Sequence, residues 1–180
     1  NATDEFSVSK KNTDIDLEVA DISIGDDAVI NVTVNENASG YVLIAIDDIH
    51  VYANITDGRA VAVIGDLAVG SYNVTVTYIG DASFNGNSTT GSFAVSQLET
   101  TIAIVGSDIY VGQSVTFNIT TSASLTEVVI VDVGGKNYTT FVEKGKGSLT
   151  VRDLAQGDYT VNVYFPGNTK YAAVNNTTSI

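Results

Sequence analysis

The side chains of this chain that are most open to chemistry are asparagines, because many stand in Asn-x-Ser/Thr sequons, the acceptor sites of N-linked glycans. The same tripeptide pattern arises by chance in a strand, where outward residues i and i+2 flank an inward Val or Ile, as in Asn31-Val32-Thr33. Both interpretations place these asparagines on a solvated face of an exported protein. The candidate glycosylation sites are Asn31, Asn37, Asn54, Asn73, Asn87, Asn118, Asn137 and Asn175, and sequons also begin at Asn1 and Asn176.

Acidic side chains are the second group with possible chemistry. The formal net charge of −13 argues against nucleic acid as a partner, since its phosphates would be repelled. Asp26, Asp27 and Asp81 are weak candidates for Ca²⁺, which binds six to eight hard oxygen ligands. The sequence has no EF-hand loop and no Asp-x-Asp-x-Asp spacing, so solvated turn carboxylates that aid solubility are the favoured interpretation. We expect no other metal and no cofactor.

Residues suited to catalysis are few. The chain has no Cys, which excludes thiol catalysis, disulfides and Cys-ligated zinc, and His50 is the only imidazole. A carboxylate pair could serve glycoside hydrolysis, but a small sandwich leaves little volume for a cleft. Lys10 and Lys11 fall in a linker rather than in a core strand, so no Lys–Asn isopeptide crosslink is expected. We therefore expect that the chain is not an enzyme.

An internal repeat organises these residues, because the sequence matches itself without a gap at an offset of 87 residues. Asp66-Leu67-Ala68-x-Gly70-x-Tyr72 then falls on Asp153-Leu154-Ala155-x-Gly157-x-Tyr159. The same register places Phe6-Ser7-Val8-Ser9 on Phe93-Ala94-Val95-Ser96, and Ile180 where Phe6 and Phe93 fall. The sequence predicts three segments: 1–11, the last strand of a preceding repeat or a donor strand; 12–97, the first repeat; and 98–180, the second repeat with an incomplete last strand.

Each repeat has the pattern of an all-β sandwich. Hydrophobic residues make up 44% of the chain and charged residues 16%, with β-branched and aromatic types favoured. Alternating runs separated by Gly, Asn and Asp predict strands in the first repeat at 14–19, 28–34, 41–46, 50–55, 59–64, 71–79 and 89–96, and their copies in the second. Seven strands in this length indicate two tandem immunoglobulin-like β-sandwich domains of about seven antiparallel strands each.

Tyr72 and Tyr159 agree with that fold. Each follows Leu-x-x-Gly-x and opens an alternating run, which is the spacing of a tyrosine corner, where a hydroxyl binds upstream backbone. The alternative is an ordinary core tyrosine. Both roles are structural.

The segment from Asp66 to Tyr78, Asp-Leu-x-x-Gly-x-Tyr-x-Val-x-Val-x-Tyr, closed by Gly80-Asp81-x-x-Phe84, resembles the Ig-like repeats of archaeal and bacterial adhesin-like surface proteins, notably those of methanogens. The resemblance covers both repeats, although Phe165-Pro166-Gly167-Asn168 departs from it. It implies an extracellular, cell-surface location and a structural or adhesive module, possible contact with a receptor, and little about the ligand.

Two further hypotheses concern partners. If the chain is a mature subunit, Phe6 and Val8 of one molecule complete the second repeat of the next, giving a head-to-tail filament by strand addition; the alternative is a piece of a longer covalent array. A competing function is a carbohydrate-binding module of an extracellular enzyme, which would need exposed tyrosines such as Tyr41, Tyr52, Tyr110 or Tyr138 side by side. No apolar run is long enough to span a bilayer.

Overall fold

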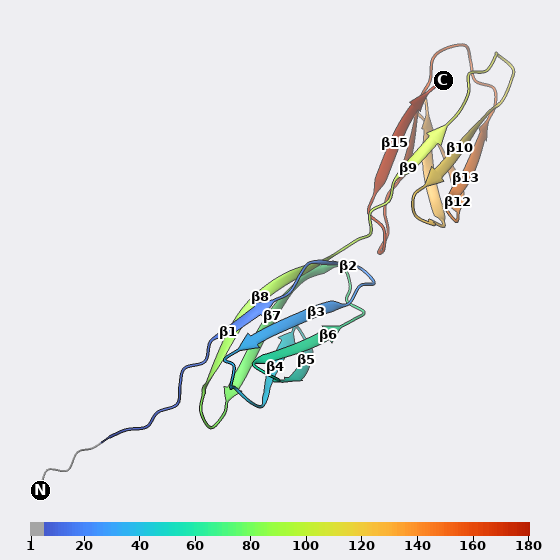
Figure 1. Ribbon diagram of the computed structural model, residues 1–180. Coiled ribbons are helices and arrows are strands. Elements are labelled where there is room, and N and C mark those ends of the chain that lie inside the picture. Colours follow the sequence, from blue (N-terminus) through green and yellow to red (C-terminus); the bar gives the residue numbers. More distant parts are fainter. Residues whose placement is uncertain (1–5) are drawn as a thin grey trace, which may run out of the picture. The chain divides into compact units, whose positions relative to one another are not determined.

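The computed structural model describes residues 6–180, and these form strands joined by turns, without a helix (Figure 1). The chain divides into two compact units between Ser96 and Gln97. In Figure 1 the first unit is coloured blue to green and the second yellow to red. No described residues form a helix long and apolar enough to cross a membrane.

The first unit is a sandwich of two sheets in the described residues. One sheet has the order β1-β3-β6 and the other the order β2-β8-β7-β4-β5. Every pairing is antiparallel except that of β2 with β8, which is parallel. The strands are β1 (Ile15–Glu18), β2 (Ile22–Ser23), β3 (Ala28–Val34), β4 (Tyr41–Ile46), β5 (Ile49–Asn54), β6 (Arg59–Ile64), β7 (Gly70–Gly80) and β8 (Asn85–Ser96).

Side-chain alternation explains why these segments become strands. In β3, Ile30 and Val32 are buried, whereas Asn31 between them is exposed. β4 and β5 form a hairpin in which Ile46 is paired with Ile49, and Asp47 in the turn has a φ of 47°. Asp tolerates this left-handed conformation better than most residues, so the Asp47-Asp48 pair sets the register of the hairpin.

The second unit repeats this order with two differences: its described residues form no counterpart of β2, and its strands form a single sheet. Its strands are β9 (Ile102–Val105), β10 (Val115–Thr121), β11 (Glu127–Val133), β12 (Lys136–Glu143), β13 (Lys146–Val151), β14 (Thr160–Phe165) and β15 (Val174–Ser179). They form one continuous sheet in the order β15-β14-β11-β12-β13-β10-β9. The sheet is continuous because β12 and β13 pair at Val142↔Gly147 and Glu143↔Lys146.

Each unit has its own hydrophobic core. The buried residues of the first core lie between Ala28 and Val95 and come from the inner faces of both sheets. Those of the second lie between Ile102 and Phe165. The chain is therefore all-β and consists of two tandem immunoglobulin-like β-sandwiches.

The predicted strands match the observed ones closely at 28–34, 41–46 and 59–64. Two features of the first unit differ. β2 was not predicted, because it has two residues and depends on parallel pairing with the distant β8. β8 begins at Asn85 rather than at residue 89, because Asn85 and Asn87 pair with Gly80 and Tyr78 instead of ending the strand.

Candidate functional site: a groove in the second sandwich

In each unit a tyrosine at the start of the sixth long strand, β7 or β14, holds the chain segment that precedes this strand. In the second unit this tyrosine forms one wall of the site. The Tyr72 hydroxyl donates to the carbonyl oxygen of Ala68 at 2.9 Å, and the Tyr159 hydroxyl donates to the carbonyl oxygen of Ala155 at 3.1 Å. These are the hydrogen bonds of a tyrosine corner. They hold the segment before β7 or β14 against the ring of the tyrosine.

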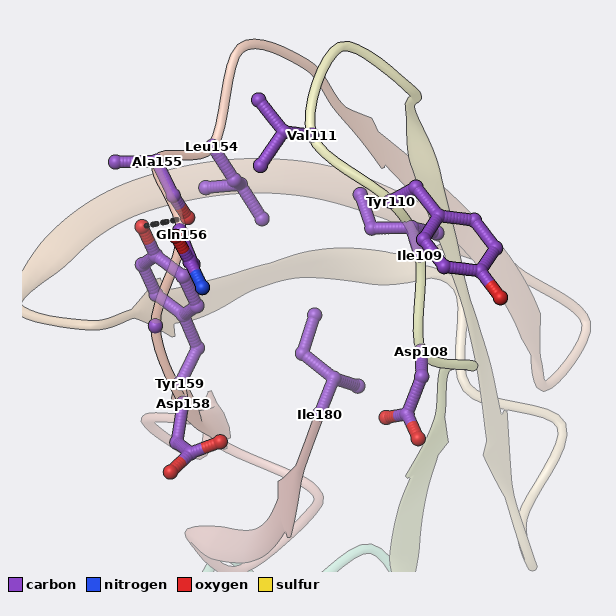
Figure 2. Close-up of a pocket in the computed structure, with 11 residues that line it drawn as sticks. Asp108, Ile109, Tyr110, Val111, Leu154, Ala155, Gln156, Asp158, Tyr159 and Ile180 are labelled. Atoms are coloured by element: carbon purple, nitrogen blue, oxygen red, sulfur yellow. Dashed lines mark hydrogen bonds between the residues drawn. The ribbon is translucent and has the colours of Figure 1, made fainter.

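A cavity lies beside Tyr159. It is an open groove of about 580 Å³, and Figure 2 shows Ile180 in it, between Tyr159 on one side and Asp108 on the other. Ile109 and Val111 line one wall, and Leu154 and Tyr159 line the other. The groove therefore offers apolar walls and two carboxylates, those of Asp108 and Asp158.

The counterpart of this groove in the first unit is filled by the end of β8. Val95 is 2% exposed and pairs with Gly70 of β7 on one side and with Ile22 of β2 on the other. The Ala94 amide donates to Asp21 Oδ1 at 2.7 Å, and the Ile24 amide donates to the Ser96 carbonyl at 2.8 Å. Three residues thus close that sandwich with both apolar and polar contacts.

At the offset of 87 residues, the residues that contact the end of β8 in the first unit have counterparts that line the groove of the second unit. Ile109, Val111, Leu154 and Gly157 correspond to Ile22, Ile24, Leu67 and Gly70, and Asp108 corresponds to Asp21. Ile180 corresponds to Phe93: it exchanges both backbone hydrogen bonds with Tyr159, at 2.9 and 3.1 Å, as Phe93 pairs with Tyr72. The open space of the groove thus corresponds to the space that Ala94, Val95 and Ser96 occupy in the first unit.

Residues 6–10 precede the first sandwich in an exposed, strand-free segment. Phe6 is 90% exposed and Val8 is 89% exposed, whereas their counterparts Phe93 and Val95 are buried. The next residue, Lys11, is bound to the sandwich, because its amide donates to Ser83 and its carbonyl accepts from Asn85. The sequence predicted only a linker at Lys11. In the repeat register Lys11 aligns with Leu98, and that alignment could have indicated a shared role in attachment.

The same attachment recurs at the start of the second unit. The Leu98 amide donates to Lys170, and its carbonyl accepts from Ala172 at 3.0 Å. Gln97 adds a side-chain hydrogen bond to the Asn168 carbonyl. Along the sequence, residues 6–9 therefore precede the attachment at Lys11 as residues 93–96 of β8 precede the attachment at Leu98.

The candidate glycosylation sites are all exposed. This holds for Asn31, Asn37, Asn54, Asn73, Asn87, Asn118, Asn137 and Asn175, and also for Asn176; Asn1 lies outside the described residues. Asn87 and Asn176 differ from the other sequon asparagines, because the side-chain amide of Asn87 donates to the Thr13 carbonyl at 2.6 Å and that of Asn176 donates to the Ile102 carbonyl at 2.8 Å. A glycan on either asparagine would have to keep or replace that contact.

The three weak calcium candidates do not meet in one place. Asp26 and Asp27 lie just before β3, and Asp26 accepts a hydrogen bond from the Ser23 amide. Asp81 follows β7 and accepts from Ser39 and from the amides of Ser83 and Phe84. Among residues 6–180, no group of three or more His, Asp or Glu side chains lies close enough to hold a metal ion.

Asp81 is a turn residue with a strong preference for its charged form. The backbone hydrogen bond from Ser83 lowers the pKa of the Asp81 carboxyl well below its ordinary value, and the bonds from Ser39 and Phe84 act in the same direction. Next to it the Tyr78 hydroxyl donates to the Ser39 carbonyl at 3.0 Å, and burial raises the pKa of Tyr78. This polar cluster joins the β7–β8 turn to the loop before β4.

One exposed aromatic pair has the arrangement that a sugar site would need. Tyr41 of β4 and Tyr52 of β5 are 38% and 66% exposed, with ring centroids 5.2 Å apart and ring planes at 83°. They are diagonal neighbours, because Tyr52 is paired with Leu43 and Tyr41 with Asn54. Tyr110 is exposed at the groove, whereas Tyr138 is packed against the second core under the Lys136 ammonium.

His50 lies in the β4–β5 hairpin. Its ring Nδ1 is 3.2 Å from the Asp48 carbonyl oxygen, two residues away. Sequence reasoning missed the residues that define the groove, Asp108, Ile109 and Leu154, because Ile109 and Leu154 are apolar and Asp108 has no other charged residue near it in the sequence. Their position opposite filled counterparts in the first repeat is the signal that could have found them.

Comparison with known proteins gives similarity of structure only. No protein-family model matches the chain, and no curated protein matches it. Fibronectin(III)-like modules of Clostridium thermocellum CbhA are 15% identical, over 92% of this chain and 92% of theirs, with a TM-score of 0.40. A titin A168–A169 structure is 13% identical, over 93% of this chain and 96% of its own, with a TM-score of 0.38.

A third similar structure is Bacteroides ovatus SGBP-B, from a mixed-linkage glucan utilization locus, in complex with a mixed-linkage heptasaccharide. It is 18% identical, over 87% of this chain and 42% of its own, with a TM-score of 0.34. The chain is similar in structure to tandem immunoglobulin-like and fibronectin(III)-like modules. At these identities the likeness concerns the fold alone and carries no function.

Proposed function

We propose that this chain is a structural and adhesive module of an extracellular cell-surface protein or filament. The observation that supports the proposal most is that each sandwich has its own core, since the two sets of buried residues come from separate stretches of sequence. Units of this kind can be repeated along a polypeptide without disturbing one another. Such a repeat serves to space or present a contact surface, and a receptor would bind to it from outside the cell.

The exposed sequon asparagines support an exported location. The sequon asparagines lie on exposed positions in both units, for example Asn31 of β3 and Asn118 of β10, which the repeat register aligns. Glycans at these positions would project into solvent without disturbing either core. We include glycosylation of the exposed sequons in the proposal.

Labelling of intact cells tests the location. Antibodies raised against the 180-residue chain are applied to cells that produce the protein, before and after permeabilisation, with an antibody to an internal protein as the control. The proposal expects full labelling of intact cells, where the control antibody gives none. Labelling that needs permeabilisation overturns it.

Carbohydrate binding is a second candidate, and the Tyr41–Tyr52 pair favours it. An exposed ring face can stack against the C–H face of a sugar. With the two ring planes at 83°, the rings do not form a flat platform, so this site would hold one sugar unit rather than a length of polysaccharide.

Binding measurements with Tyr41→Ala and Tyr52→Ala test this second candidate. Tyr164→Ala is the matched control, because Tyr164 is exposed to a degree similar to Tyr41 but lies in β14 of the other unit. Binding to a panel of soluble glycans that both variants lose and the control keeps supports a sugar site. Equal binding by all three variants contradicts it.

We also propose that the chain has no catalytic activity of its own. His50, the only imidazole, lies on an exposed hairpin beside the Asp48 carbonyl. Turnover of a glycoside or ester substrate by the purified chain, reduced by His50→Ala or by substitution of a groove carboxylate, would contradict this part of the proposal.

A further inference from the structure

We infer that the N-linked glycans of Asn54 and Asn175 lie back against the sheet, each with its first sugar unit packed on the tyrosine directly opposite, Tyr41 or Tyr164. The inference deepens the proposed function and rests on it, because it takes the glycosylation of the exposed sequons as its starting point. It names two of these sequons and the side chains that their glycans contact. The ligand of each tyrosine is therefore a neutral sugar that belongs to the same chain.

The register of the β4–β5 hairpin places one sequon beside an aromatic pair. Asn54 of β5 is paired with Tyr41 of β4, so both side chains leave the same face of the sheet, and both are exposed. Residues opposite each other in antiparallel strands have Cβ atoms about 4.5–5.5 Å apart. Tyr52, two residues before Asn54, lies on this face too, and its ring centroid is 5.2 Å from that of Tyr41. A sugar on the Asn54 amide nitrogen thus begins next to both rings.

The second unit has the same arrangement on a different pair of strands. Asn175 of β15 is exposed and is paired with Tyr164 of β14, which is 40% exposed. On its other side Tyr164 is paired with the partly buried Ile130 of β11. Tyr164 therefore lies between an apolar neighbour and a glycan acceptor.

Comparison of the two units shows that tyrosine and sequon occur together. At the offset of 87 residues, the counterparts of the first pair are Val128 and Phe141, which are likewise paired but include neither a tyrosine nor a sequon asparagine. The counterparts of the second pair are Thr77 and Ser88, which are paired and again include neither. A sequon that arose by chance at an outward position would not need a tyrosine opposite it, so the joint occurrence favours a contact between them.

The chemistry of a sugar ring suits this position. One face of the ring presents C–H groups that can lie on an aromatic ring, while the hydroxyl groups at its edge stay in water. Such a contact is weak between separate molecules, but the covalent link to asparagine holds the sugar beside the tyrosine and removes most of the cost of association. A second copy of the chain is a poorer ligand, because it has the same net charge of −13 and would be repelled.

Melting temperatures of the whole chain test the inference, after secretion from a yeast host and trimming to one N-acetylglucosamine at each occupied sequon. Asn54→Gln is expected to lower the melting temperature of the first unit by about 4–8 °C, but by less than about 2 °C when Tyr41→Val is also present. Val is the residue that the second unit has at this strand position, so Tyr41→Val should keep the fold. In the chain made in bacteria without glycans, Asn54→Gln is expected to change the melting temperature by less than about 2 °C.

Asn73→Gln is the matched control, because Asn73 is also an exposed sequon asparagine of the first unit but is paired with the exposed Ser92. Any effect of its glycan is expected to be the same with and without Tyr41→Val. In the second unit the corresponding test combines Asn175→Gln with Tyr164→Thr, since Thr77 is the counterpart of Tyr164. It is expected to show the same dependence of the glycan on the tyrosine.

A spectrum of the sugar reports the contact itself, and mass spectrometry records which sequons carry a sugar. With ¹³C-labelled N-acetylglucosamine, the C–H protons of the unit on Asn54 are expected upfield of their free positions, because of the ring current of the tyrosines, and should move back in Tyr41→Val. A sugar on Asn54 whose resonances and stabilising effect are unchanged by Tyr41→Val overturns the inference, while glycosylation of the sequons stands. Absence of a sugar from Asn54 in the secreted chain also overturns it. Neither result bears on the labelling of intact cells, so the two proposals fail separately.

Discussion

Truncation of one core residue should destabilise one sandwich and leave the stability of the other unchanged. Phe117 of β10 is fully buried, and a Cβ added at the neighbouring Gly106 would lie 2.6 Å from its ring, so the ring fills the space against that backbone. Phe117→Ala removes the ring from a closely packed site. The expected loss is about 3–5 kcal/mol of unfolding free energy.

That loss is large compared with the stability of a small domain, which is about 5–15 kcal/mol. For a domain of this size it lowers the melting temperature by about 15–30 °C. The reciprocal variant is Ile30→Ala, because Ile30 is fully buried at the equivalent position of β3 and belongs to the first core. It should lower the melting temperature of the first unit by a comparable amount, for a loss of about 2–5 kcal/mol.

Differential scanning calorimetry of the whole chain, with near-UV spectra to monitor the tyrosines, measures both transitions. Each variant should move one transition and leave the other within about 2 °C of its original position. A single cooperative transition that both variants lower would refute the reasoning, because it would mean that the two cores are energetically one.

Three further predictions concern hydrogen bonds, backbone and pH. Tyr159→Phe removes the hydrogen bond to Ala155 and should lower the unfolding free energy of the second unit by about 0.5–1.5 kcal/mol in urea titrations, and no change would mean that the bond is not formed. Gly80→Ala should lower the unfolding free energy clearly more than Gly112→Ala in the same assay. Both glycines have a left-handed φ, 87° and 86°, but a Cβ at Gly80 would lie 2.7 Å from the Phe84 oxygen, whereas one at Gly112 meets open space. Equal losses of unfolding free energy would contradict this. Because folding lowers the pKa of Asp81, its charged carboxylate stabilises the first unit at pH values above the ordinary carboxyl pKa. This stabilisation is lost as the pH falls through the lower pKa of Asp81 in the folded state. Between about pH 7 and about pH 2 the melting temperature of the first unit should therefore fall less in Asp81→Asn than in the original chain, and parallel curves would exclude this role.

Asn168 explains why Asp81→Asn should keep its fold. It stands at the equivalent turn of the second unit, where its Oδ1 accepts from the amides of Lys170 and Tyr171 at 2.9 and 2.8 Å. An asparagine therefore serves this turn without a charge. The charge of Asp81 adds stability that depends on pH, and it is not needed for the geometry.

Much of the fold could be predicted because short runs rich in β-branched residues are bounded by Gly, Asn and Asp. In β3 and β6 buried and exposed positions alternate strictly, although Val61 and Val63 of β6 are exposed apolar residues, and the predicted bounds agree with the structure. β2 could not be found this way, because two residues carry no periodicity and their strand exists through pairing with Val95 and Ser96. The pairing of β12 with β13 is likewise a tertiary result, since nothing in the sequence states that the hairpin joins the two layers.

The candidate site was predicted only in part. The tyrosine corners have a local spacing, so Tyr72 and Tyr159 could be named from the sequence. The Tyr41–Tyr52 contact needs the register of the β4–β5 hairpin, which the two-residue turn after Ile46 would have supplied. The repeat register placed Ile180 where Phe93 falls, and the structure pairs it there with Tyr159.

The most direct test of the two-sandwich account is to separate the units and ask whether each folds alone. The cut belongs between Ser96 and Gln97, because Gln97 and Leu98 are hydrogen-bonded to the second unit. Amide ¹H–¹⁵N spectra of residues 1–96 and 97–180 should each reproduce the dispersed peaks of the whole chain, apart from residues at the cut. A narrow, unfolded spectrum from both halves would contradict the account.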